Sequence, residues 1–376
     1  MKRISRYKTE LWLPITIVLF AIISILTIWS ATSLLPSYLS DLALKQMAWY
    51  FVGFILVYFM MFLGKEWIYK YAWYLYIIGT IFLVLLLFFG EEINNARCWF
   101  SIPGIGTIQP SEFMKIILII TLGRMIEEFH LKYKSPSIKE ELLFLLKVGI
   151  VVLIPSILTF LEPDTGVVLI YLLITITMLF ISGIRYRWFL LGLSIIALFL
   201  TFLLLLYFFN KDLFVKIFGT SFFLRIDRLL DWSNTSGFQL EHGMSAIGSG
   251  GFLGNGFNNT PIYFPEPQTD FIFAVYASNF GFLGSCVLIC LILFFDIKLI
   301  FLAIHSREKI DKYVISGILG MLLYQQFQNI GMTFGLMPIT GITLPFISYG
   351  GSSLLSYMIM IGIIFNISNS NLRYTN

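Results

Sequence analysis

The stretch 11–31, LWLPITIVLFAIISILTIWSA, contains no charged residue and is long enough to cross a lipid bilayer as a helix. The hydrocarbon core of a bilayer is about 30 Å thick, which requires about 20 helical residues. The stretch lacks a cleavage site of small residues, so we expect it to be retained as a first helix rather than removed as a signal peptide.

Comparable apolar runs recur through the 376 residues, of which 58% are hydrophobic and only 12% are charged. This composition excludes an ordinary soluble domain and predicts an all-α polytopic membrane protein, because helices satisfy their own backbone polar groups in lipid. We expect about ten transmembrane helices in a single integral-membrane domain, 1–376, with a large extracellular loop at about 210–269 between helices 7 and 8. The expected helices are 11–31, 44–63, 71–89, 110–126, 142–160, 165–182, 187–209, 270–303, 311–334 and 344–367.

The positions of the basic residues predict the orientation of these helices. If the N-terminus is cytoplasmic, 18 of the 25 Lys and Arg residues fall on the cytoplasmic side, as expected for short inner loops. We therefore expect both termini inside and the 210–270 segment outside. In a membrane protein the placement of the charges is more informative than the net charge of +4. No nucleic-acid partner is expected.

No metal or nucleotide site is evident from spacing. The three histidines are scattered, which argues against a His-based metal site, whereas Mg²⁺ or Mn²⁺ held by carboxylates stays open. The glycine-rich stretch 248–256 lacks the Lys-Ser/Thr ending of a phosphate-binding loop, and we expect it to allow a backbone bend.

The stretch 265–273, PEPQTDFIF, leads from the outer loop into a long apolar helix. Thr269 is expected at the N-cap and Asp270 in the first turn, where the helix dipole stabilises a carboxylate without any catalytic role. Catalysis is the alternative, because an ionisable group facing a bundle at the membrane boundary is costly unless it has a function.

The stretch 109–112, QPSE, begins another helix, and Glu112 and Lys115 lie one turn apart on one face. An internal ion pair and a substrate-facing role are both open. Arg97, in the preceding outer loop, is by itself a surface charge, although a guanidinium suits the paired oxygens of a pyrophosphate.

Two further outer segments carry charge. The stretch 162–166, EPDTG, has the composition of a tight turn. Arg225 belongs to a run of charged residues at helical spacing within 225–231, which predicts either a surface helix with internal ion pairs or arginines that bind a headgroup phosphate.

These motifs, taken in order, resemble one family. They are Gln109–Glu112 with Lys115, Pro163–Gly166, Ala246–Gly251, Pro265–Glu266 with Thr269–Phe273, and Pro338–Ser352. Together they resemble the SEDS family (shape, elongation, division and sporulation) of bacterial cell-wall proteins, over nearly the whole chain. Ala246–Gly250 and Asn329–Met332 are more similar to the elongation member RodA than to the division member FtsW.

The resemblance implies a ten-helix peptidoglycan glycosyltransferase in the bacterial cytoplasmic membrane, which polymerises lipid II and undecaprenyl-pyrophosphate-linked glycan on the outer face. It also implies a class B penicillin-binding transpeptidase and other elongation-complex membrane proteins as partners. Asp270 falls on the family's essential aspartate and is the candidate catalytic base. The candidate substrate-binding residues are Arg97, Gln109, Ser111, Glu112, Lys115, Asp164, Arg225, Glu266, Thr269, Ser348 and Tyr349.

The chain departs from the family pattern at three places. Ser278-Asn279 stands where two glutamates are usual, His242-Gly243 replaces Gln-Ser, and Trp232 replaces a proline. A division or sporulation paralogue with the same chemistry, a lipid II flippase and a non-catalytic scaffold for a transpeptidase are therefore the alternatives. Flippases commonly place ionisable residues near the membrane midplane in repeated halves, and no repeat is evident here.

Overall fold

The structure is a computed structural model that describes residues 9–93, 96–102, 106–220, 222–223, 226 and 237–373. The described elements are α1 (Trp12–Thr32), η1 (Ser37–Leu39), α2 (Leu42–Leu63), α3 (Lys65–Lys70), α4 (Ala72–Phe89), β1 (Glu91–Ile93), β2 (Ala96–Ile102), β3 (Gly106–Ile108), α5 (Pro110–Lys132), α6 (Ile138–Leu161), α7 (Thr165–Ser182), α8 (Tyr186–Phe209), α9 (Lys211–Phe218), α11 (Phe238–Ser249), α12 (Ile272–His305), α13 (Lys309–Thr333) and α14 (Gly351–Arg373).

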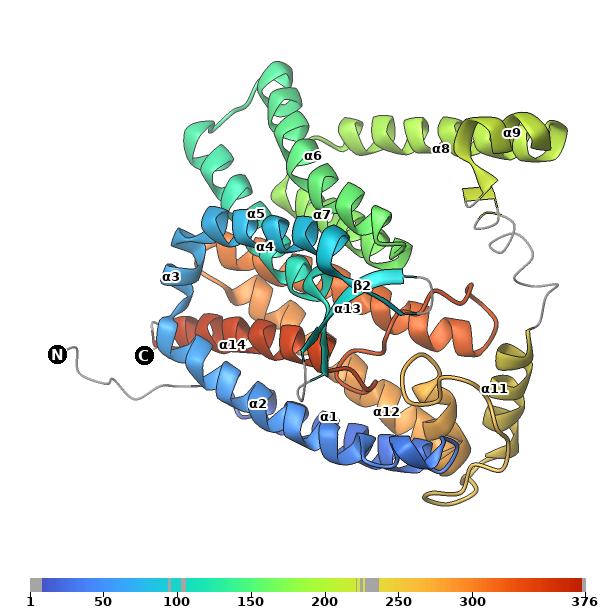
Figure 1. Cartoon of the computed structure of the whole chain (residues 1–376). Coiled ribbons are helices and arrows are strands. Elements are labelled where there is room, and N and C mark those ends of the chain that lie inside the picture. The colour runs from blue at the N-terminus through green and yellow to red at the C-terminus, as the bar shows by residue number, and fades with distance from the viewer. Residues whose placement is uncertain are drawn as a thin grey trace.

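The long helices form a bundle in which two polar helices, α5 and α13, are enclosed by apolar ones (Figure 1). Eight described helices are long and apolar enough to span a bilayer, namely α1, α2, α4, α6, α7, α8, α12 and α14. Helix α5 packs against α4, α7, α13 and α14, and its charged side chains Glu112 and Lys115 are buried in protein. The predicted all-α polytopic membrane fold is confirmed.

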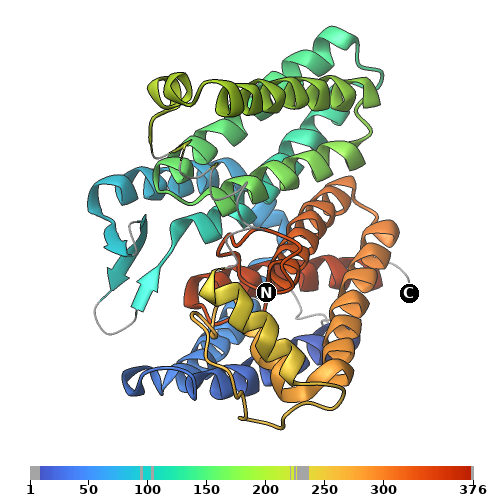
Figure 2. The same cartoon turned by 90° about the vertical axis from the view of Figure 1, so that its right-hand side faces the viewer.

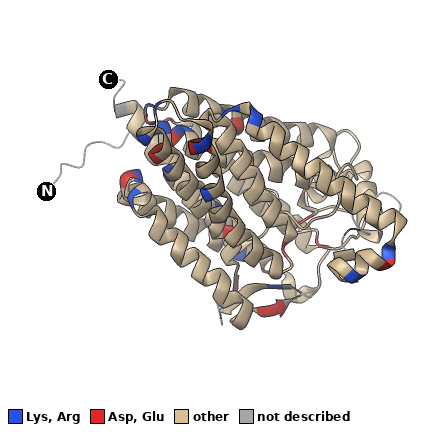
Figure 3. Cartoon of the chain, turned by 90° about the horizontal axis from the view of Figure 1, so that it is seen from above, with Lys and Arg blue, Asp and Glu red and all other residues tan. Residues whose placement is uncertain are grey.

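Charged residues concentrate at the helix ends, and many lie at the end of the bundle that carries both chain termini (Figure 3). Only a few lie between the two ends. This distribution suits a bundle whose middle is surrounded by hydrocarbon, where an unpaired charge is expensive.

The ten predicted spans correspond to ten of these helices, and nine of them begin within four residues of the predicted position. The tenth is a correction, because α14 begins at Gly351 rather than at 344. The preceding residues are non-helical: Phe346 has a positive φ of 66°, and the Ser348 hydroxyl accepts a hydrogen bond from the Leu344 N–H. Local apolar composition does not reveal such a tertiary constraint.

The segment between α4 and α5 contains a small antiparallel sheet with the strand order β1-β2-β3. The pairing of Phe100 with Ile108 and of Ile102 with Gly106 sets its β2–β3 register. The sheet connects α4 to the start of α5 and places one face of β2 over the interior of the bundle.

The segment between α8 and α12, which was predicted as the large loop, contains α9 and α11, and α11 packs against α12 (Figure 2). Helix α12 is interrupted at Gly281, whose φ of 63° is in the left-handed region. The glycine-rich segment fills this interruption: the Phe282 N–H donates to Gly251 O, and the Asn255 N–H donates to Ser278 O. The bend expected at 248–256 is therefore present, and its function is to pair with the broken helix.

The unusual pair Ser278-Asn279 lies at the same place. Asn279 Nδ2 donates to Ser30 Oγ of α1, and Asn279 Oδ1 accepts from Thr260 Oγ1 at 3.0 Å. Ser278 Oγ accepts from Asn255 Nδ2 at 3.2 Å. Two neutral side chains thus connect the outer loop, α1 and α12 through hydrogen bonds.

Candidate active site

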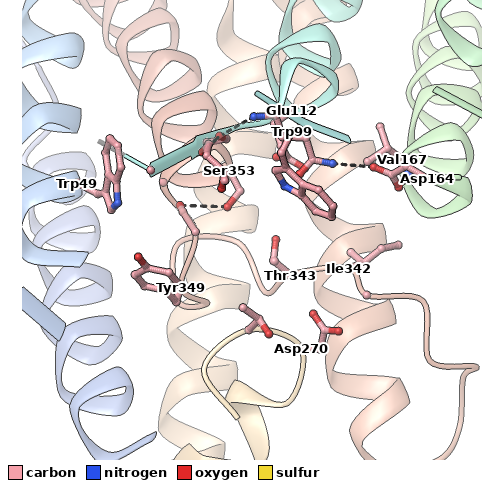
Figure 4. Close-up of a pocket in the computed structure, with 18 of the residues that line it drawn as sticks. Trp49, Trp99, Glu112, Asp164, Val167, Asp270, Ile342, Thr343, Tyr349 and Ser353 are labelled. Atoms are coloured by element: carbon pink, nitrogen blue, oxygen red, sulfur yellow. Dashed lines mark hydrogen bonds between the residues drawn. The ribbon is translucent and has the colours of Figure 1, made fainter. Parts of the chain in front are cut away.

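A cavity of about 1140 Å³ lies among α2, α5, α7, strand β2, the turn before α12 and the segment 335–350 (Figure 4). Its two polar ends differ in composition. Asp270, Thr343 and Tyr349 lie toward one end, whereas Glu112, Trp99 and Asp164 lie toward the other. Seven predicted site residues line this cavity: Gln109, Glu112, Asp164, Glu266, Thr269, Asp270 and Tyr349.

Asp270 precedes α12, which begins at Ile272 with Phe271 at the N-cap. The expected capping arrangement is therefore wrong: the helix has no acidic residue in its first turn, and the Thr269 hydroxyl donates to Glu266 Oε2 at 2.9 Å instead. The helix starts later than expected because Glu266, with a positive φ of 51°, turns the chain and its carbonyl accepts from the Phe271 N–H. Asp270 does not cap this helix, and its carboxylate lies at the cavity.

Buried polar side chains hold the backbone around Asp270. Asn329 Nδ2, on α13, donates to the carbonyl oxygens of Asp270 at 2.9 Å and Ile342 at 2.8 Å. The Ser348 hydroxyl donates to Thr269 O at 2.7 Å, and the Tyr349 N–H donates to the carbonyl of the preceding residue of this turn, Gln268, at 2.9 Å. Hydrogen bonds thus join the turn 266–270 to the segment 335–350. Ser348 belongs to this hydrogen-bonded unit and lies behind the cavity wall.

Two effects raise the basicity of the Asp270 carboxylate. Burial, and to a lesser extent the nearby charge of Glu266, together raise the pKa of Asp270 to about 7. Gly341 packs beside this carboxylate, since a Cβ at that glycine would lie 3.7 Å from Asp270 Oδ2. A carboxylate with a pKa near neutrality can accept a proton at ordinary pH.

The other end of the cavity is built around the start of α5. Gln109 Nε2 donates to Asp164 Oδ2 at 2.8 Å, and Asp164 also caps α7 by accepting from the Val167 N–H at 3.1 Å. The predicted ion pair is present, with Lys115 Nζ 2.7 Å from Glu112 Oε2. Lys115 itself is fully buried behind Glu112, so only the carboxylate side of the pair faces the cavity.

The turn 162–166 combines strain with buried charge. Pro163 has a positive φ of 33°, and the buried Glu162 precedes it. Burial raises the pKa of Glu162 to about 8 and that of Asp164 to about 6. Non-glycine residues with positive φ thus occur in three segments around the cavity, at Pro163, Glu266 and Phe346, as is common at functional sites.

Four described residues among those predicted do not line the cavity, namely Lys115 and Ser348, which lie behind its wall, and Arg97 and Ser111. Arg97 Nη2 lies 3.3 Å from Glu92 Oε2, with both side chains more than half exposed, and Ser111 is buried within α5. Arg225 lies outside the described residues. Their predicted substrate-binding roles stay predictions.

Sequence reasoning missed several cavity residues. Lys45 and Trp49 come from α2, Trp99 from β2, and Ser352 and Ser353 from the start of α14. Lys45 and Trp49 are four residues apart on an apolar helix, a signal that could have indicated one shared face, although not which element the face contacts.

Among the described residues, no group of three or more His, Cys, Asp and Glu side chains could hold a metal ion. One or two carboxylates bind Mg²⁺ mainly together with substrate phosphates. Glu266 and Asp270 are the pair available at one end, and a divalent cation there stays a prediction.

The arrangement suits chemistry on a large amphipathic substrate. One end offers a carboxylate with a raised pKa, and the other offers amide and carboxylate groups that can hydrogen-bond hydroxyl and amide groups. The cavity lies among membrane helices, so a lipid-linked polar molecule is the class of substrate that fits both features.

Comparison with known proteins agrees with this architecture. Residues 10–373 match the model of the cell cycle protein family FtsW/RodA/SpoVE. The chain is 32% identical to the probable peptidoglycan glycosyltransferase FtsW of Lactococcus lactis (79% of this chain, 77% of that protein) and 33% identical to the peptidoglycan glycosyltransferase MrdB of Helicobacter pylori (87% and 83%).

A solved structure is also similar to this chain over nearly its full length. It comes from work described as "Structural coordination of polymerization and crosslinking by a peptidoglycan synthase complex", with a TM-score of 0.79, 26% identity and coverage of 98% of this chain and 99% of that one. The chain is therefore a multi-pass membrane protein that belongs to the FtsW/RodA/SpoVE family of cell cycle proteins.

Proposed function

We propose that this protein is a peptidoglycan glycosyltransferase that polymerises lipid II at the outer face of the bacterial cytoplasmic membrane. The observation that carries the proposal is the Asp270 carboxylate, which has a pKa near 7 and lines a cavity of about 1140 Å³ enclosed by membrane helices. Family membership and relatives named as peptidoglycan glycosyltransferases support the same activity.

In the proposed reaction, the 4-hydroxyl of the acceptor lipid II sugar attacks the anomeric carbon of the growing strand. The hydroxyl proton passes to the Asp270 carboxylate, the new glycosidic bond forms, and the bond between the anomeric carbon and the pyrophosphate oxygen breaks. Undecaprenyl pyrophosphate leaves from the face opposite to attack, so the configuration inverts, as in inverting glycosidases, where one carboxylate activates the nucleophile. A base with a pKa near the working pH is suited to this step.

The hydrogen bonds around Asp270 serve this step by fixing where the base lies. Asn329 and Ser348 hold the backbone of Asp270 and Thr269 against the segment 335–350. Such pre-positioning removes part of the entropic barrier to a reaction between two bound molecules. Gln109 and Asp164, at the other end, are proposed to bind polar groups of one substrate.

We place the protein in cell elongation, with a class B penicillin-binding transpeptidase as partner and both termini in the cytoplasm. The residues Ala246–Gly250 and Asn329–Met332 support elongation, whereas the identities to FtsW and MrdB relatives are nearly equal, at 32% and 33%. The similar chain from a synthase complex supports a partner of this kind. A division or sporulation role would use the same chemistry.

The test is a polymerisation assay with purified full-length protein in detergent or nanodiscs. The protein is incubated with lipid II, with and without a class B transpeptidase, and the products are separated by gel. Glycan strands are the expected result. Translocation of labelled lipid II in proteoliposomes without glycan strands would indicate a flippase, and neither activity in the presence of the transpeptidase would indicate a scaffold.

A further inference from the structure

We propose that Lys45, on α2, binds the pyrophosphate of the lipid-linked substrate and of the undecaprenyl pyrophosphate product. This inference rests on the proposed function and adds a residue to it. It begins from the charges on the cavity wall. Among the described lining residues there are four carboxylates, those of Glu112, Asp164, Glu266 and Asp270, and one cation, Lys45.

A pyrophosphate that enters this cavity meets mostly negative charge. Like charges in a site of reduced dielectric repel strongly, and catalysis of pyrophosphate departure requires positive charge positioned in advance. A cation on the wall is therefore needed both for binding and for the leaving group.

The cations expected from the sequence do not meet this need in the described structure. The Lys115 ammonium is fully buried, 2.7 Å from Glu112 Oε2 and above the ring of Tyr357. Arg97 pairs with Glu92 at 3.3 Å and does not line the cavity. Lys115 neutralises a neighbouring carboxylate, and Arg97 is paired with Glu92 and is not among the residues that line the cavity.

Lys45 lines the same cavity as Asp270. Trp49, one turn further along α2, packs against the start of α14, where a Cβ at Gly351 would lie 2.6 Å from its ring. The Tyr349 hydroxyl lies beside Trp49, and the charge of Asp41 acts on it. Asp41 is the ion-pair partner of Lys45. The Tyr349 N–H in turn binds the turn that carries Asp270.

The Lys45 ammonium is available for a ligand. Its distance to Asp41 Oδ2 is 3.5 Å, and both side chains are more than half exposed. An exposed pair of this kind contributes little free energy, so a pyrophosphate can displace Asp41. A lysine presents three N–H donors and a compact charge, which suits phosphate oxygens.

The test measures binding without turnover, so its result does not depend on whether the protein polymerises lipid II. Full-length protein in nanodiscs is titrated with undecaprenyl pyrophosphate, and with undecaprenol as the uncharged probe of the same lipid tail. We expect Lys45→Gln to raise the Kd for undecaprenyl pyrophosphate by about tenfold or more, because a charge-assisted contact is lost. Lys45→Arg should stay within about threefold of wild type, because the positive charge that binds the phosphates is kept.

Two matched controls isolate the charge at the cavity. Asp41→Asn removes the ion pair but keeps Lys45, and Lys211→Gln removes an exposed lysine of α9, away from the cavity. Both should bind undecaprenyl pyrophosphate as wild type does, and no variant should change undecaprenol binding. The proposal is overturned if Lys45→Gln keeps the wild-type Kd, if Asp41→Asn weakens binding equally, or if undecaprenol binding falls in parallel.

Discussion

Replacing Asn329 with alanine should slow polymerisation far more than it weakens substrate binding. Asn329 is fully buried, and its Nδ2 donates to the backbone carbonyls of Asp270 at 2.9 Å and Ile342 at 2.8 Å. Losing both bonds leaves two carbonyl groups without these donors, which lowers the free energy of unfolding by about 2 to 4 kcal/mol. A displacement of the base by about 1 Å can cost about a hundredfold in rate, so we expect kcat to fall by about ten- to a hundredfold and KM to change less than threefold.

The assay compares initial rates of glycan formation across lipid II concentrations, with thermal unfolding of each variant measured in the same detergent. Gln328→Ala is the matched control, because Gln328 is the adjacent buried residue of α13 and donates one hydrogen bond to Pro338 O at 2.7 Å, away from Asp270. Asn329→Asp, which keeps the shape but removes both donors, should resemble Asn329→Ala. The reasoning is refuted if Asn329→Ala has the same kcat as Gln328→Ala at similar stability.

Three further outcomes follow from the same structure. Burial and the charge of Glu266 raise the pKa of Asp270 to about 7, so the base is increasingly protonated below that pH. The polymerisation rate should therefore fall about tenfold per pH unit toward pH 5. A flat profile of rate against pH from 5 to 9 would contradict this. Gly281→Ala should lower the free energy of unfolding by about 2 kcal/mol or more, because the positive φ of Gly281 and the close backbone of Gly254 exclude a Cβ. Gly192→Ala is the control: a Cβ at Gly192 has no other atom within 4 Å, so this variant should not be destabilised in thermal unfolding. Glu112→Gln should lower the free energy of unfolding by about 3 to 5 kcal/mol, because it leaves the buried charge of Lys115 without its partner. The double variant Glu112→Gln, Lys115→Met should recover most of this loss. Equal stability of the single and double variants would argue against the ion pair.

Most of the helices could be predicted from the sequence because each apolar run must cross the same thickness of hydrocarbon. The start of α14 could not, since Leu344 and Phe346 are as apolar as the helix itself. Their conformation is decided by the hydrogen bond from the Leu344 N–H to Ser348 Oγ and by the contact of this segment with the turn before α12. The sheet between α4 and α5 was likewise not anticipated, because two of its three strands have only three residues and leave little pattern.

The candidate site was predictable in its motifs but not in its spatial arrangement. The spacing around Asp270 allowed both a helix cap and a base, and the start of α12 at Ile272 excludes the cap. Lys45 carried no motif, and its relation to Asp270 depends on contacts between α2 and residues about 300 positions away in the sequence. Tertiary packing, rather than local sequence, creates that relation.

The rate of glycan formation from purified lipid II by Asp270→Asn tests the central claim most directly. We predict a loss of about a hundred- to ten-thousandfold relative to wild type, the range contributed by a positioned base, with unchanged thermal stability and unchanged affinity for undecaprenyl pyrophosphate. Polymerisation by Asp270→Asn at the wild-type rate would contradict the assignment of this carboxylate as the base.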